Sequence, residues 1–116
     1  MPNDLERLAA RRAAERRAEA LPRAIMALEE LGARGVDAGV VGSLARDQLK
    51  DHSDVDFVIL DDRGIFYDEL MAAIERRMRP IPIDMILLRW IAPEDRATFL
   101  KDLRHADELR SLMATA

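Results

Sequence analysis

The 116-residue sequence has a formal net charge of −4, no cysteine, and 49% hydrophobic against 34% charged residues. These values suit one globular domain with a modest core, and they exclude disulfides and thiolate metal sites. No apolar run approaches the roughly 20 residues of a membrane span, no signal peptide is visible, and the acidic balance argues against direct nucleic-acid binding. We therefore expect a cytoplasmic protein without a membrane partner.

The composition of residues 1–21 predicts an Arg- and Ala-rich helical arm. We expect the main domain to span residues 22–116. The arm consists mostly of good helix formers, but it has few large apolar side chains to bury. Residues 1–23 carry six Arg against four acidic residues, whereas the rest of the chain is acidic. Two interpretations stay open: a solvated arm, or a segment that docks on a partner.

Helical and strand patterns alternate after the arm. In chain order, we expect a new or kinked helix from Pro22, a strand at 36–41, a helix at 44–50 capped by Ser43, a strand at 54–60, a helix at 66–78, a strand at 83–88, and a last helix that begins near Pro93 and carries apolar positions from Phe99 to Met113. This order predicts an α/β (α+β) fold, in which helices flank a small mixed sheet of at least three strands. Trp90 is expected to pack in the core, with base stacking as the alternative.

Three aspartates on predicted strands form the candidate catalytic and metal-binding set. Asp54 and Asp56 are two residues apart, so strand alternation places both on one face, about 6.6 Å apart along the strand. Asp84 is the only charged residue in the third strand. Neighbouring carboxylates repel unless a cation neutralises them, and Mg²⁺ prefers oxygen ligands. Three carboxylates can hold two metal ions, which suits phosphoryl displacement.

The Gly42-Ser43 pair lies between the first strand and the next helix. Glycine lets the backbone approach a phosphate closely, and a helix start directs N–H groups to the same place. Arg46 lies one turn further on, where its charge could meet phosphate oxygens. Each of these elements also has a purely structural interpretation. Asp-x-Asp pairs arise by chance, and Gly-Ser is an ordinary strand-to-helix turn.

Taken together, Val40–Arg46, Ser53–Val58 and Pro82–Ile86 resemble the signature of the DNA polymerase β-like nucleotidyltransferase superfamily. They are most similar to its minimal nucleotidyltransferases (MNT), the antitoxins of MNT–HEPN toxin–antitoxin pairs. The resemblance implies the polymerase β-like fold and triphosphate binding by Gly42, Ser43 and Arg46. It also implies that Asp54, Asp56 and Asp84 hold Mg²⁺, with Asp84 in addition activating the acceptor hydroxyl.

For the MNT group, the implied reaction transfers AMP from ATP to a tyrosine hydroxyl of a cognate HEPN-type RNase toxin, which is thereby silenced. A hetero-oligomer with that toxin is then expected. Two other functions stay open: a non-catalytic module that neutralises its partner by occlusion, and a nucleotidyltransferase with a small-molecule acceptor. The sequence departs from the pattern in two places. Asp47 stands where the family often has glycine, and the N-terminal arm lies outside the core motif.

Overall fold

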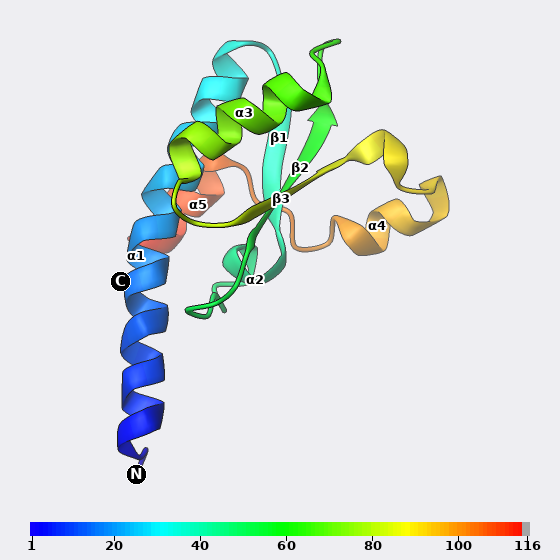
Figure 1. The fold of residues 1–116 in the computed structure, drawn as a ribbon. Helices are drawn as coiled ribbons and strands as arrows, with labels where there is room; N and C mark the ends of the chain where they lie inside the picture. Colours follow the sequence, from blue (N-terminus) through cyan, green and yellow to red (C-terminus); the bar gives the residue numbers. More distant parts are fainter. Residues whose placement is uncertain (115–116) are drawn as a thin grey trace.

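A three-stranded sheet packed against helices forms the centre of the computed structural model, which describes residues 1–114 (Figure 1). The elements are α1 (Asp4–Ala33), β1 (Asp37–Val41), α2 (Gly42–Ala45), β2 (Val55–Asp61), α3 (Tyr67–Met78), β3 (Ile83–Leu87), the 3-10 turns η1 (Leu88–Trp90) and η2 (Pro93–Asp95), α4 (Arg96–Phe99) and α5 (Ala106–Met113). The last two residues of the expected domain, 115 and 116, lie outside the described residues. Of the helices described, none combines the length and the apolar character that crossing a membrane requires.

The sheet is mixed, with β2 in the middle. Strand β1 pairs with β2 in antiparallel orientation, and β3 pairs with β2 in parallel orientation. Consequently the end of β1 and the starts of β2 and β3 meet at one end of the sheet, beside α2 (Figure 1). The expected α/β architecture with a small mixed sheet is confirmed.

The two faces of the sheet have different surroundings. On one face, alternate strand residues are buried in the core against α1 and α3, and these residues are Ala38, Val40, Val55, Phe57, Ile59, Met85 and Leu87. The opposite face carries the intervening residues, among them Asp56 and Asp84, which are register partners. The period-two alternation of a strand thus separates the core from the carboxylates.

Helix α1 runs without interruption from Asp4 to Ala33 and contains Pro22 in its interior, so the expectation of a new helix at Pro22 is wrong, whereas a kink there stays a prediction. A proline inside a helix costs about 3 kcal/mol. Beyond it, however, Ile25, Leu28 and Leu31 are all at most 5% exposed. Each such burial contributes roughly 1.5–3 kcal/mol, which outweighs the cost of the proline.

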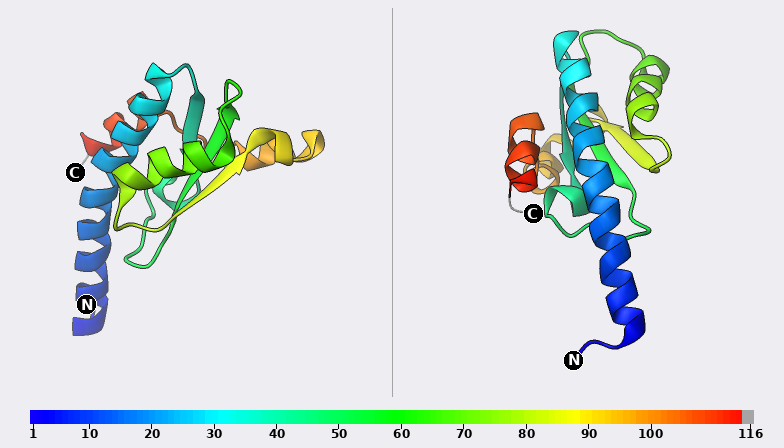
Figure 2. Two further views of the ribbon diagram at one scale, coloured as in Figure 1. Left: turned by 45° about the horizontal axis from the view of Figure 1, so that its top comes forward. Right: turned by 90° about the vertical axis from the view of Figure 1, so that its left-hand side faces the viewer.

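The N-terminal turns of α1 extend beyond the body of the molecule (Figures 1 and 2). Burial along this helix begins only at Ala20, and Leu5 is 78% exposed. The change in burial falls near the division expected between residues 1–21 and 22–116, although one helix spans both parts. That division stays a prediction.

The single last helix expected up to Met113 is wrong. The chain instead forms α4, a turn at residues 100–102, an extended segment at residues 103–105, and α5. In the extended segment Arg104 exchanges two backbone hydrogen bonds of 2.9 Å with Val40 of β1. Strand β1 lies at an edge of the sheet, and an edge strand has unpaired backbone groups that favour such pairing. Pairing with this edge therefore replaces helical periodicity in the segment.

Smaller differences concern α2 and Trp90. Helix α2 is a single turn that ends at Ala45, and its N-cap is Val41 rather than Ser43. Trp90 is 59% exposed and stacks on Tyr67, with ring centroids 5.3 Å apart, so its expected place in the core is wrong. The short turn η1 ends β3 at Leu87 and carries Trp90 out to the surface.

Gly39→Ala is expected to destabilise the protein by about 1–3 kcal/mol, the range for overpacking a core. A Cβ at Gly39 would lie 2.6 Å from Leu103 Cδ1 and 2.8 Å from the Arg104 carbonyl oxygen. The backbone of the extended segment would have to move away from β1. Urea denaturation measures the loss. Gly32→Ala is the control, because its added Cβ meets nothing within 4 Å, and equal stability of the two variants would contradict this packing.

Candidate active site

The pairing of β2 with both neighbouring strands brings three parts of the candidate site together. Asp56 is the register partner of Asp84 on β3 and of Val41, the last residue of β1. Gly42 follows Val41 directly, and its backbone lies against the Asp56 carboxylate, so that an added Cβ would collide with Oδ2. Residues separated by up to 42 positions in the chain therefore share one end of the sheet.

Asp54 lies just before β2 rather than on it. Asp54 and Asp84 are exposed, whereas Asp56 is half-buried. Burial raises the pKa of Asp56, and the negative charges of Asp84 and Asp54 raise it further. The carboxylates of Asp54 and Asp84 are therefore close enough to Asp56 to repel its negative charge, as neighbouring like charges do.

A divalent cation suits this set of donors. The donors are all carboxylate oxygens, which are the ligands that Mg²⁺ prefers, and the negative charges of Asp54 and Asp84 lie near Asp56. Within residues 1–114, however, no three acidic or histidine side chains are already gathered into a group that could hold a metal ion. The strands bring the backbones of Asp56 and Asp84 together, so these two aspartates and the neighbouring Asp54 are the residues that could hold an ion.

The turn at Gly42 has the backbone geometry that requires glycine. Its φ is +79°, in the region that residues with a Cβ rarely adopt. The helix that follows is only four residues long, so its dipole is much smaller than that of the two-turn helix expected from the sequence. The first N–H groups of α2 remain as donors, since no side chain caps the helix. Gly42 and Ser43 are both half-buried at this end of the sheet.

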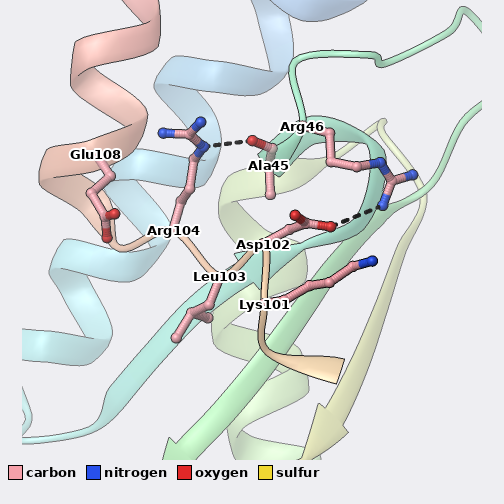
Figure 3. Close-up of a pocket in the computed structure, with 7 residues that line it drawn as sticks. All are labelled: Ala45, Arg46, Lys101, Asp102, Leu103, Arg104 and Glu108. Atoms are coloured by element: carbon pink, nitrogen blue, oxygen red, sulfur yellow. Dashed lines mark hydrogen bonds and ion pairs between the residues drawn. The ribbon is translucent and has the colours of Figure 1, made fainter. Parts of the chain in front are cut away.

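Arg46 directly follows α2, and its charge opposes the rise in the pKa of Asp56. Its guanidinium lies 3.7 Å from the carboxylate of Asp102. Both side chains line a cavity of about 250 Å³ that also contains Lys101 and Arg104 (Figure 3). In Figure 3 the side chains of Arg46 and Lys101 extend toward the same side of this cavity.

Arg104 supports α2 from the other side of the cavity. Its Nε donates a 2.5 Å hydrogen bond to the carbonyl oxygen of Ala45, the last residue of α2 (Figure 3). The sequence did not indicate Lys101 or Arg104 as neighbours of α2, because both were expected in a long helix. Pairing of Arg104 with β1 is what brings them there.

Asp47, which departs from the family pattern, has φ +56°, so it adopts the conformation in which glycine is common. Its carboxylate accepts a 2.6 Å hydrogen bond from Arg17 of α1. Because Arg17 belongs to the N-terminal arm, the two departures from the pattern are in contact with each other.

Comparison with known proteins agrees with this geometry. A sequence profile described as "Nucleotidyltransferase domain" matches residues 21–109. A crystal structure of a "putative nucleotidyltransferase" from Sulfolobus solfataricus superposes with a TM-score of 0.50 at 19% identity, covering 81% of this chain and 85% of that one. At this identity the likeness concerns the fold. No curated protein matches the sequence.

The matched region runs from the buried half of α1 into the first turn of α5, so it contains the three strands and α2. It includes the Gly42 turn and all three aspartates. The fold is that of polymerase β-like nucleotidyltransferases, with the carboxylates at the end of the sheet where the Gly-Ser turn begins. The chain belongs to the nucleotidyltransferase domain family, whose members transfer a nucleotidyl group.

Proposed function

We propose that the protein is a Mg²⁺-dependent adenylyltransferase that moves AMP from ATP to a tyrosine hydroxyl of a cognate HEPN-type RNase toxin and so acts as its antitoxin. The observation that carries the chemical part is the register of β2, which sets Asp56 beside both Asp84 and the Gly42 turn. The choice of ATP and of this acceptor follows the resemblance to MNT proteins.

In this reaction the acceptor oxygen bonds to the α-phosphorus of ATP. The bond from that phosphorus to the oxygen bridging to the β-phosphate breaks, and pyrophosphate leaves. Backbone N–H groups at Gly42 and Ser43 would donate to the triphosphate, and Arg46 would balance its charge. Asp84, on the exposed part of the site, would take the proton of the hydroxyl.

Mg²⁺ held by Asp54, Asp56 and Asp84 would supply positive charge to the attacking and leaving oxygens. Lys101 shares the cavity of Arg46, and we assign it to the outer phosphates. The ion pair between Arg46 and Asp102 would have to break before Arg46 could contact a phosphate. In the absence of nucleotide, Asp102 would keep the Arg46 side chain in place.

The exposure of the site supports an acceptor carried on another macromolecule. Asp54 and Asp84 are both exposed, so a tyrosine side chain presented by a partner can approach them from solvent. A tyrosine hydroxyl has a pKa near 10, so it needs a neighbouring base or cation to attack at neutral pH. The carboxylates supply that environment.

Incubation with Mg²⁺, ATP and the cognate HEPN protein is expected to increase the mass of the HEPN protein by whole AMP units. The Asp54→Ala/Asp56→Ala variant should leave that mass unchanged, because it lacks two of the three carboxylates. Intact-mass spectrometry makes the measurement, with folding of both proteins checked by circular dichroism. An unmodified partner with folded, ATP-binding wild-type protein would contradict the proposal.

A second candidate is neutralisation by occlusion, without catalysis. It is supported by exposed apolar side chains that suit a protein interface, since Phe66 is 84% and Trp90 59% exposed. Under this alternative the carboxylate variant protects RNA from the toxin as well as wild type does. Loss of protection in a variant that still binds the toxin favours catalysis.

Modification of an added small hydroxyl compound, with the toxin unmodified, would instead indicate a small-molecule acceptor.

A further inference from the structure

Two arginines in the first half of α1 hold the loop that joins the two parts of the site. This loop, residues 46–53, connects the end of α2 to Asp54. Arg16 donates two hydrogen bonds, of 3.1 and 2.7 Å, to the carbonyl oxygen of Asp51. Arg17 donates to both carboxylate oxygens of Asp47, at 2.6 and 3.4 Å. The loop is therefore tied to α1 near both of its ends.

The conformation of Asp47 decides how the chain leaves α2. Its φ of +56° is unfavourable for most residues with a Cβ, although Asp tolerates it better than most. The N–H of Asp47 donates a 3.0 Å hydrogen bond to the carbonyl oxygen of Leu44. The N–H of Gln48 donates a 2.8 Å hydrogen bond to the carbonyl oxygen of Ser43. The turn around Asp47 thus closes directly onto the residues expected to meet the triphosphate.

The charge of Asp47 also needs a partner. Asp47 directly follows Arg46. A free carboxylate at position 47 would repel bound phosphates and would compete with them for the Arg46 guanidinium. Arg17 pairs with it in a partly shielded position, where the two side chains are 22% and 35% exposed. Arg17 also donates a 2.7 Å hydrogen bond to the carbonyl oxygen of Leu112, so the guanidinium is fixed from two sides.

We infer that Arg17 is a positioning residue for the nucleotide. It keeps Asp47 in the left-handed conformation and keeps its carboxylate on the α1 side. The backbone of α2 is then already in the conformation that binds the triphosphate. A glycine at position 47 would adopt this conformation without help and would carry no charge. The inference rests on the proposed function, because it assumes that α2 receives ATP.

Binding of Mg²⁺-ATP to the full chain, measured by calorimetry, tests this role. Arg17→Gln is expected to weaken binding about three- to tenfold, because the turn at Asp47 loses the stabilisation that one charge-assisted hydrogen-bonded pair provides. Asp47→Gly should bind at least as tightly as wild type. In the Asp47→Gly background, Arg17→Gln should weaken binding no further, because the group that it positions is gone. Arg11→Gln is the matched control, since Arg11 is exposed on the same helix and its side chain forms none of the hydrogen bonds described within residues 1–114.

Amide hydrogen exchange of the nucleotide-free protein gives a second measurement. The N–H of Gln48 should exchange faster in Arg17→Gln than in wild type, and at the wild-type rate in Arg17→Gln/Asp47→Gly. Arg17→Lys, which keeps the charge but loses the two-pronged geometry, should lie between wild type and Arg17→Gln in both measurements.

Wild-type affinity in Arg17→Gln would overturn the inference. So would an undiminished loss in the Asp47→Gly background, because Arg17 would then act through Leu112 and α5. These results would leave the proposed function intact. Failure of the folded wild-type protein to bind ATP would overturn both.

Discussion

Asp56→Asn is expected to reduce the rate of nucleotidyl transfer about a thousandfold or more, because it removes the central charged ligand of the site. Asparagine has nearly the same size, so the register of β2 with β1 and β3 should stay unchanged. Incorporation of labelled nucleotide into the acceptor measures the rate. Asp61→Asn is the matched control, since Asp61 is exposed at the far end of the same strand. Comparable losses in both variants would contradict a local role for Asp56.

The same substitution is expected to stabilise the metal-free protein. Burial and the charges of Asp84 and Asp54 raise the pKa of Asp56 in the folded state. A raised carboxyl pKa means that the folded state disfavours the ionised form. That penalty is absent below the unfolded-state pKa and fully present above the folded-state pKa. At pH 7 wild type therefore carries a penalty that Asp56→Asn lacks.

We expect a gain of about 0.5–1 kcal/mol at pH 7, kept modest by solvent screening of a half-buried group. Urea denaturation in the presence of a chelator measures it. The gain should be smaller at pH 4, where the wild-type carboxyl binds a proton more often. Lower stability of Asp56→Asn than of wild type at pH 7 would contradict this account of the electrostatics.

Gly42→Ala is expected to reduce transfer about a hundredfold and stability by about 1–2 kcal/mol. Part of the loss is the φ of +79°, which costs roughly 1–2 kcal/mol for a residue with a Cβ. The larger effect on activity arises because the new methyl group collides with Oδ2 of Asp56. The carboxylate can move away at small cost to the fold, but it then leaves its place between Gly42 and Asp84.

Gly64→Ala separates these two causes. Gly64 has the same φ of +79°, but an added Cβ there meets nothing within 4 Å. The Gly64→Ala variant should lose about as much stability as Gly42→Ala, measured by thermal unfolding, and should keep full activity. If Gly42→Ala retains activity, or if both variants lose it equally, the close approach of the Gly42 backbone to Asp56 does not matter for the reaction.

The sequence was sufficient for features that depend on local periodicity. Alternation along a strand places Asp56 opposite the core residues, and the helix expected at 66–78 corresponds to α3, which buries Leu70, Ile74 and Met78, although Phe66 is exposed. The sequence could not establish that Val41 pairs with Asp56, because the register between strands depends on packing across the sheet. This pairing is what brings the Gly42 turn to the carboxylates.

Two of the wrong predictions share a physical cause, since tertiary contacts outweigh local preference in both. Burial of Ile25, Leu28 and Leu31 carries α1 through Pro22. Arg104 forms a backbone pair with Val40 at the free edge of β1, and this pairing replaces the middle of the expected last helix. Neither the sheet edge nor the packing partner of a helix is visible in a window of a few residues.

From the sequence, Asp47 is a departure from the family pattern without a structural reason. Its positive φ shows why glycine suits this position, and its ion pair shows how Asp is accommodated here. The partner, Arg17, lies 30 residues earlier in a segment that composition alone described as a polar helix. The assignment of Gly42, Ser43, Arg46, Asp54, Asp56 and Asp84 to nucleotide and metal binding stays a prediction.

The most direct test of the central claim follows two labels on ATP, one on the α-phosphate and one on the γ-phosphate, during incubation with Mg²⁺ and the HEPN acceptor. Nucleotidyl transfer predicts that the α-label appears on the acceptor, that the γ-label is released in pyrophosphate, and that Asp84→Asn abolishes both. Appearance of the γ-label on the acceptor would indicate phosphoryl transfer instead. No label on the acceptor, with ATP bound to wild type, would contradict catalysis on this partner.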